Sequence, residues 1–205
     1  MSGRFPDNPE ELFDDDETFD LREDFPTLDA VRRFARVAQE IPWFSRVGER
    51  ISPEDRKIAK LYVEALGFPE AEIAEVGDWQ EAAIAATNLD VDTPAFEAEE
   101  QLRSALTAEA LELMDEDLLT FALTHLSGLI AEIVENAAAD AALRAGYDDE
   151  ETIRAAAGAA IQAAHQAALV LAAGVEDDSA PAHKFRLFEA GRWPLGLIGT
   201  SLHIF

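Results

Sequence analysis

The chain has 205 residues, of which 48% are hydrophobic and 28% are charged, a composition typical of a globular protein with one sizeable core. Its 42 acidic residues outnumber 16 basic ones, and the net charge of -26 disfavours nucleic-acid phosphates and anionic lipid as partners because both would repel it. It contains no cysteine, which excludes disulfides, thiol catalysis and cysteine-ligated metal sites.

The sequence shows no targeting or membrane-spanning pattern. Acidic and polar residues stand at its start, where a secretory signal would have a basic flank and an apolar run. No stretch reaches about 18 consecutive apolar residues, the length expected of a helix that crosses a bilayer. We therefore expect a cytoplasmic protein without membrane contact. Two explanations of the acidity stay open: it suits a salt-adapted or GC-rich source, and it would suit a basic protein partner.

Residues 1–27 form an acidic segment with aromatic and leucine side chains spaced along it. A disordered arm would carry few aromatic residues, so we expect this segment to pack on the body of the protein. Its acidic run Asp14–Glu17 lacks the alternation, the central glycine and the terminal glutamate of an EF-hand loop. A solvated segment is therefore favoured there over a calcium site.

Residues 28–114 are predicted to form several short helices. Most begin at a small polar residue that can cap the first turn, and a proline often follows at the first helical position. Apolar residues at three- and four-residue spacing then mark one face. The predicted helices span about 28–40, 53–66, 79–88 and 94–105, with a short helical turn within 69–77, and Thr107 or Asp115 begins the next section.

Two long helices, 116–145 and 150–173, form the predicted centre of the fold. The first carries a stripe of leucine, isoleucine, valine and alanine at helical spacing and is closed by Gly146. The second is rich in alanine, whose short side chains let two helix axes approach closely, and is closed by Gly174. The connection of about five residues favours an antiparallel pair.

The tail, residues 179–205, carries cations and aromatic residues on an otherwise acidic chain. Its alternating pattern predicts a small antiparallel β meander with a first strand over 184–189 and turns at Ala190-Gly191 and Gly199-Thr200. A small sheet is marginal on its own, so its rings should be buried on the helices and its cations should face acidic residues. The rings concerned are Phe185, Phe188 and Trp193, and the cations are Lys184, Arg186 and Arg192.

These patterns together predict a mainly α protein, a single-domain multi-helix bundle centred on the two long antiparallel helices. The expected organisation is an acidic N-terminal segment (1–27), a helical domain (28–178) and a docked C-terminal β element (179–205).

One cluster of candidate site residues lies on the two long helices. His125 and Glu132 are seven residues apart, so they share a face two turns apart, and Glu135 lies on the adjoining strip. His165 on the second helix would approach the level of His125 in an antiparallel pair. Imidazoles and carboxylates on facing helices bind zinc, iron or manganese. The spacing matches neither H-E-x-x-H nor Glu-x-x-His, so packed histidines and solvated acids are the favoured interpretation.

The tail holds the one basic neighbourhood of the sequence. Its cations are interleaved with aromatic rings, as in a platform for single-stranded nucleic acid. The net charge of -26 opposes that use, so we expect no nucleic-acid partner and favour contacts with the chain's own acids. The residues concerned are His183, Lys184, Arg186, Arg192 and His203.

Three hypotheses about function follow, since no G-x-S-x-G, Walker A or Rossmann pattern is present. The leading one is a non-catalytic interaction or structural protein, as a homodimer through the alanine-rich helices. The second is a metal-binding protein or metal-dependent enzyme that uses His125, Glu132 and His165, with Glu135 as a further ligand. The third is an acidic decoy that binds a basic protein surface. No cofactor is predicted apart from the divalent metal of the second hypothesis.

Overall fold

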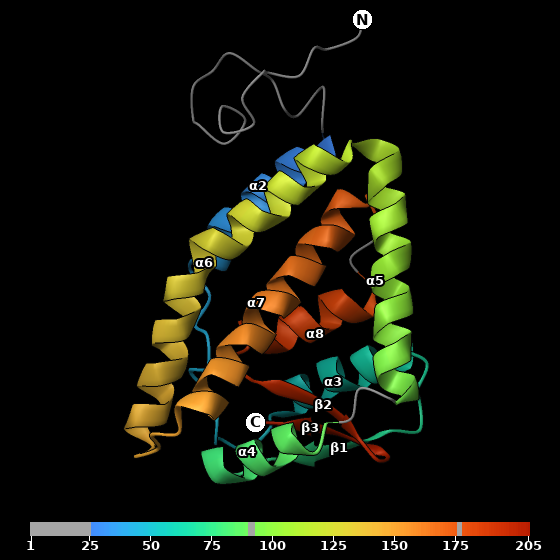
Figure 1. Ribbon diagram of the computed structural model, residues 1–205. Helices are drawn as coiled ribbons and strands as arrows, with labels where there is room; N and C mark the ends of the chain where they lie inside the picture. Colours follow the sequence, from blue (N-terminus) through green and yellow to red (C-terminus); the bar gives the residue numbers. More distant parts are fainter. Residues whose placement is uncertain (1–25, 90–92, 176–177) are drawn as a thin grey trace, which may run out of the picture.

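The computed structural model describes residues 26–89, 93–175 and 178–205, and these form a mainly helical protein with a small sheet (Figure 1). The expectations for residues 1–25, including those for Asp14–Glu17, lie outside the described residues. In chain order the elements are α2 (Pro26–Ala38), α3 (Pro53–Ala65), β1 (Glu72–Glu75), α4 (Trp79–Thr87), α5 (Pro94–Leu113), α6 (Glu116–Arg144), α7 (Glu150–Ala172), α8 (Ala180–Glu189), β2 (Pro194–Ile198) and β3 (Ser201–Ile204).

The two long helices α6 and α7 are the antiparallel central pair that the sequence predicts (Figure 1). Each begins at an aspartate whose side chain accepts a hydrogen bond from a backbone N–H in the first turn: Asp115 from Leu118 and Asp149 from Thr152. α7 also contacts α2, α5 and α8, so it lies at the centre of the molecule. Its alanines are therefore largely buried, among them Ala156, Ala160, Ala163, Ala164, Ala167 and Ala168.

By length and composition alone, α6 and α7 are apolar enough to cross a membrane. The apolar stretch of α7 is 61% buried inside the molecule and that of α6 is 39% buried. The core helices of water-soluble proteins pass the same test, so these two helices are weak evidence for a membrane span.

The sheet has the order β1-β3-β2, with β3 antiparallel to β2 and parallel to β1. The predicted turn at Gly199-Thr200 joins β2 to β3, and Gly199 has the positive φ of 61° that such a turn favours. β1 pairs with β3 from far along the chain, with Glu72 opposite Ser201. The sheet therefore ties the segment after α3 to the end of the chain, at one end of the helical body (Figure 1).

The predicted first strand of the tail is wrong, because residues 184–189 belong to helix α8. This helix is buried on more than one side, so its sequence lacks the single apolar stripe of a surface helix. Phe185 and Phe188, three residues apart, both contact Trp43, with ring centroids 5.9 and 6.0 Å away. Leu187 packs on the other side, in a second cluster that includes Tyr62 of α3.

Two further elements differ from the sequence prediction. The helical turn expected within 69–77 is instead strand β1. The strand has only four residues and depends on backbone hydrogen bonds to β3, a distant segment that local sequence patterns do not reveal. The helix expected over 94–105 continues to Leu113, so Asp115, and not Thr107, begins the next helix.

The three rings expected to dock on the helices, those of Phe185, Phe188 and Trp193, are all buried. Phe185 lies 4.9 Å from the ring of Phe34 on α2, and Trp193 lies 6.0 Å from the ring of Trp79 on α4. All three belong to the same apolar cluster as the buried residues of α6 and α7.

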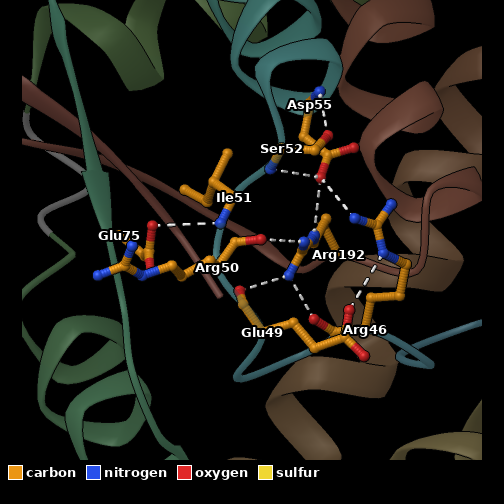
Figure 2. A network of polar contacts seen from close by, with 8 residues as sticks. All are labelled: Arg46, Glu49, Arg50, Ile51, Ser52, Asp55, Glu75 and Arg192. Carbon is orange, nitrogen blue, oxygen red and sulfur yellow. Dashed lines mark hydrogen bonds and ion pairs between the residues drawn. The ribbon is translucent and has the colours of Figure 1, made fainter.

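The buried Arg192 joins the tail to the segment before α3 (Figure 2). Its side chain has no exposed surface, and its Nε donates to Oδ2 of Asp55 at 3.1 Å. Its terminal nitrogens donate to the backbone carbonyls of Glu49 and Arg50, each at 2.7 Å, and to that of Arg46. The guanidinium thus links the loop of residues 46–50 to Asp55 in the first turn of α3.

Asp55 has a second role, because it forms a capping box at the start of α3. Its N–H donates to the Ser52 hydroxyl at 3.1 Å, and its carboxylate accepts from the Ser52 N–H at 3.2 Å. Burial by itself raises the pKa of Asp55, but these hydrogen bonds and the charges of Arg192 and Arg46 outweigh it, so the pKa lies below the ordinary 3.8.

We predict that Arg192→Met destabilises the protein by about 3–5 kcal/mol, because it leaves a buried carboxylate and several carbonyls without their donor. Urea denaturation of both proteins measures the loss. Arg154→Met is the control, since the interaction of Arg154 in the described part of the chain is an exposed pair with Glu150, whose loss should change stability by less than about 0.5 kcal/mol. Equal effects of the two changes would contradict a central role for Arg192.

A second prediction concerns acid. The folded pKa of Asp55 lies below its unfolded value, so its contribution to stability is complete above pH 3.8 and is lost as the pH falls through the folded pKa. Asp55→Asn should lower stability at neutral pH and make the remaining stability less sensitive to pH below about 4. Denaturation curves at several pH values test this, with the exposed neighbour Glu54→Gln as control. An unchanged acid dependence in Asp55→Asn would contradict the assignment.

Candidate functional site

The structure does not bring the four residues of the predicted metal site together. His125 is half-buried and stacks on Phe121, with ring centroids 5.8 Å apart, while Glu132 and Glu135 are exposed. His165 lines a different pocket, between α5 and α6. Among residues 26–89, 93–175 and 178–205, no group of three or more His, Cys, Asp or Glu residues could hold a metal ion.

The surroundings of His165 also disfavour a cation. Burial lowers the pKa of His165, and the positive charge of Arg103 lowers it further, so the imidazole is neutral at neutral pH. A neutral imidazole can bind a metal, but a neighbouring guanidinium repels one. The remaining lining of that pocket consists of leucine and threonine side chains and one carboxylate, that of Glu116.

The basic residues of the tail likewise do not form one shared platform. His183 is buried: its Nε2 lies 3.0 Å from Oδ1 of Asp178, and its Nδ1 accepts from Arg186 at 3.1 Å. His203 is partly buried in β3, and its burial lowers its pKa. Arg192 is enclosed in the network already described. Lys184 lines a cleft.

Lys184 forms a polar cluster with residues from two other helices. Glu99 of α5 accepts at Oε1 from the ammonium of Lys184 of α8, at 2.8 Å, and from the hydroxyl of Tyr62 of α3. The Lys184 ammonium also lies 5.8 Å from the centroid of the Tyr62 ring, within reach of a cation–π contact. We call these three residues the Tyr62–Glu99–Lys184 cluster.

In this cluster the opposite charges of Glu99 and Lys184 balance each other, and the Tyr62 phenol lies beside them. Burial raises the pKa of Tyr62 well above 10.0, and the negative charge of Glu99 and the hydrogen bond to it raise it further. The phenol therefore stays protonated and acts as a donor. The side chains of Glu99 and Lys184 are 23% and 16% exposed, so their opposite charges are only partly screened by water.

The cluster lies in a cleft of about 240 Å³ between α5, α7 and β2. The cleft wall combines the cluster with Gln162 and Gln166 of α7 and with a set of apolar side chains. A narrower crevice continues from it and shares Gln166 and the three cluster residues. The apolar lining of the cleft includes Leu89, Phe96, Leu195 and Leu197.

Gln166 distinguishes this cleft from an ordinary surface hollow. The residue is only 6% exposed, and no hydrogen bond within the described part of the chain engages its amide. Neither the nitrogen nor the oxygen of the amide is fully buried, so both can bond water or a ligand in the cleft. The amide borders the same cleft as the charged pair. This arrangement indicates a place where a polar molecule completes the hydrogen bonds.

A larger hollow, about 620 Å³, lies between α4 and the start of α7 but is a weaker candidate. It opens widely to solvent, and two of its polar side chains already serve the fold. Asp149 accepts from the backbone and the hydroxyl of Thr152, which itself accepts from Tyr147. No buried polar group is left to recognise a ligand among the described residues that line it.

Comparisons of this chain with protein-family models, with curated proteins and with solved structures find no match.

Sequence reasoning did not find this site, because its residues come from four separate helices and share no motif. Tyr62 has the spacing of a helix core residue, and Gln166 is next to His165, a predicted metal ligand. The one usable signal was Lys184, a cation in the tail that was expected to meet an acid. It does so, and the acid is Glu99 of α5.

We predict that Tyr62 titrates well above free tyrosine. The chain has two tyrosines, so Tyr147→Phe leaves Tyr62 alone, and the ultraviolet absorbance of the phenolate reports its ionisation. The midpoint should lie well above pH 10.0, and adding Glu99→Gln should lower it because the negative charge is lost. A midpoint near 10.0 in the folded Tyr147→Phe protein would contradict the burial and the bond to Glu99.

Proposed function

We propose that the protein is a non-catalytic binding protein that takes a small molecule into the cleft beside the Tyr62–Glu99–Lys184 cluster. The observation that carries this proposal is the partly buried ion pair of Glu99 and Lys184 with the amide of Gln166 beside it in one cleft. Glu99 and Lys184 keep hydrogen-bonding capacity beyond their mutual contact, and the Gln166 amide makes no hydrogen bond within the described part of the chain. A bound polar molecule can bond all three groups in place of water.

The chemistry of the cleft favours recognition over reaction. Tyr62 keeps its proton at neutral pH, and Lys184 is held by Glu99, so neither acts as a free base or nucleophile. Thr93 uses its hydroxyl to accept from the Phe96 N–H at the start of α5. The described lining residues include no histidine paired with a hydroxyl or a second carboxylate.

The other hypotheses draw less support from the geometry. The alanines of α7, which motivated a homodimer through that helix, already pack inside one chain. The metal hypothesis lacks converging ligands among the described residues. Homo-oligomerisation, a basic protein partner and a cytoplasmic location stay predictions of the sequence.

A cleft-filling variant tests the proposed function. Ala159 of α7 lines the cleft, whereas Ala155, one turn earlier, is exposed outside it. Methionine is favourable in helices, so both Ala159→Met and Ala155→Met should fold. We expect small molecules that protect the wild type and Ala155→Met against thermal unfolding to fail with Ala159→Met.

The stabilisation expected at a ligand concentration of 100 times Kd is about 2.7 kcal/mol, which a thermal-shift screen detects readily. Native mass spectrometry of the purified protein adds a direct search for a retained small molecule. If no compound separates Ala159→Met from the other two proteins, the proposed binding function is wrong.

A further inference from the structure

Resting on the proposed function, we infer that the ligand of this cleft is a free α-amino acid with an apolar side chain. Its ammonium group bonds Glu99, its carboxylate bonds Lys184 and the amide of Gln166, and its side chain lies among the apolar residues of the wall.

The ion pair has unused capacity on both partners. Tyr62 and Lys184 both donate to Oε1 of Glu99, and no other donor in the described part of the chain reaches Oε2. A carboxylate accepts about four hydrogen bonds and an ammonium donates three, so each group can bond a ligand without giving up the other. The cleft thus offers one anionic and one cationic contact side by side.

The charges of the site select a zwitterion over a singly charged molecule. A ligand with one positive and one negative group pairs both Glu99 and Lys184 and adds no net charge to a partly buried site. An anion would enter against the net charge of -26, and a simple cation would lie next to the Lys184 ammonium. The amide of Gln166 provides both a donor and an acceptor, so it fits either end of the zwitterion.

The size and lining of the cleft set the rest of the ligand. Drug-sized ligands occupy pockets of roughly 300–1,000 Å³, so a cleft of about 240 Å³ suits something smaller than a nucleotide or cofactor. Leu89, Phe96, Leu195 and Leu197 provide an apolar part of the cleft wall in addition to the polar cluster. Burial of a leucine or phenylalanine side chain there supplies the hydrophobic part of the affinity.

Calorimetric titration of the wild-type protein with leucine and phenylalanine tests the inference without any variant. We expect a Kd below about 1 mM for at least one of them. Two analogues of leucine isolate its charges: 4-methylpentanoate lacks the amino group and 3-methylbutylamine lacks the carboxylate. Each should bind about tenfold more weakly or worse. An analogue that binds as tightly as leucine would overturn the zwitterion.

Variants assign each charge to its residue. Glu99→Gln should weaken leucine about tenfold but leave 4-methylpentanoate unchanged, because that analogue has no ammonium group. Lys184→Met should weaken leucine similarly and leave 3-methylbutylamine unchanged. The controls are Glu97→Gln on the same helix and Lys57→Met on α3, both exposed residues outside the cleft. Leucine binding that survives both cleft variants would overturn the inference.

The outcomes separate this inference from the proposed function on which it rests. If neither leucine nor phenylalanine binds, but another small molecule protects the wild type and not Ala159→Met, the amino acid is wrong and the binding function stands. If nothing protects the wild type selectively, both are wrong.

Discussion

The buried guanidinium of Arg192 is the constraint on which the arrangement of the outer helices depends. A charge without exposed surface is tolerable only when a counter-charge and enough acceptors surround it. Arg192 obtains these from Asp55 and three carbonyls of the 46–50 segment, so that segment and the first turn of α3 must close around it (Figure 2). Because Arg192 follows α8 directly, the same contacts set α3 against α8, the two helices that carry Tyr62 and Lys184. These contacts therefore help to bring Tyr62 and Lys184 to the same cleft.

Close backbone approach makes that closure possible. Gly191 has a φ of 77°, and a Cβ at this position would lie 2.3 Å from the Ser45 hydroxyl and 3.0 Å from the Arg46 nitrogen. The carbonyl of Gly191 accepts from the Arg46 N–H at 3.1 Å, so backbone meets backbone next to the buried guanidinium. A residue with a side chain would be strained by both its φ and its neighbours. Gly191 thus lets the chain before Arg192 pack closely against residues 45 and 46, which the buried position of Arg192 requires.

The sequence predicts the parts of this fold that local patterns determine. The long apolar stripe, the aspartate caps and the closing glycines place α6 and α7 almost to the residue. Helix α8 is not predicted because neighbouring elements bury several of its faces, so it has no single apolar stripe. Strand β1 is not predicted because its hydrogen bonds come from β3, far along the chain. The site is not predicted for the same reason: Tyr62, Glu99 and Lys184 lie on three different helices and meet only after these have packed. Periodicity reports which face of an element is buried, but it carries no information about which distant side chains meet there.

The contrast between the two buried polar clusters is the argument for function. Around Arg192 every guanidinium nitrogen has an acceptor, and the interaction is explained by the stability of the fold. Around Gln166 the same protein keeps an amide and a partly exposed ion pair that have hydrogen-bonding capacity beyond their contacts within the described chain. Water can use that capacity, and so can a polar ligand. Polar groups with spare hydrogen bonds, grouped in one cleft of suitable size beside apolar side chains, are what a binding site requires.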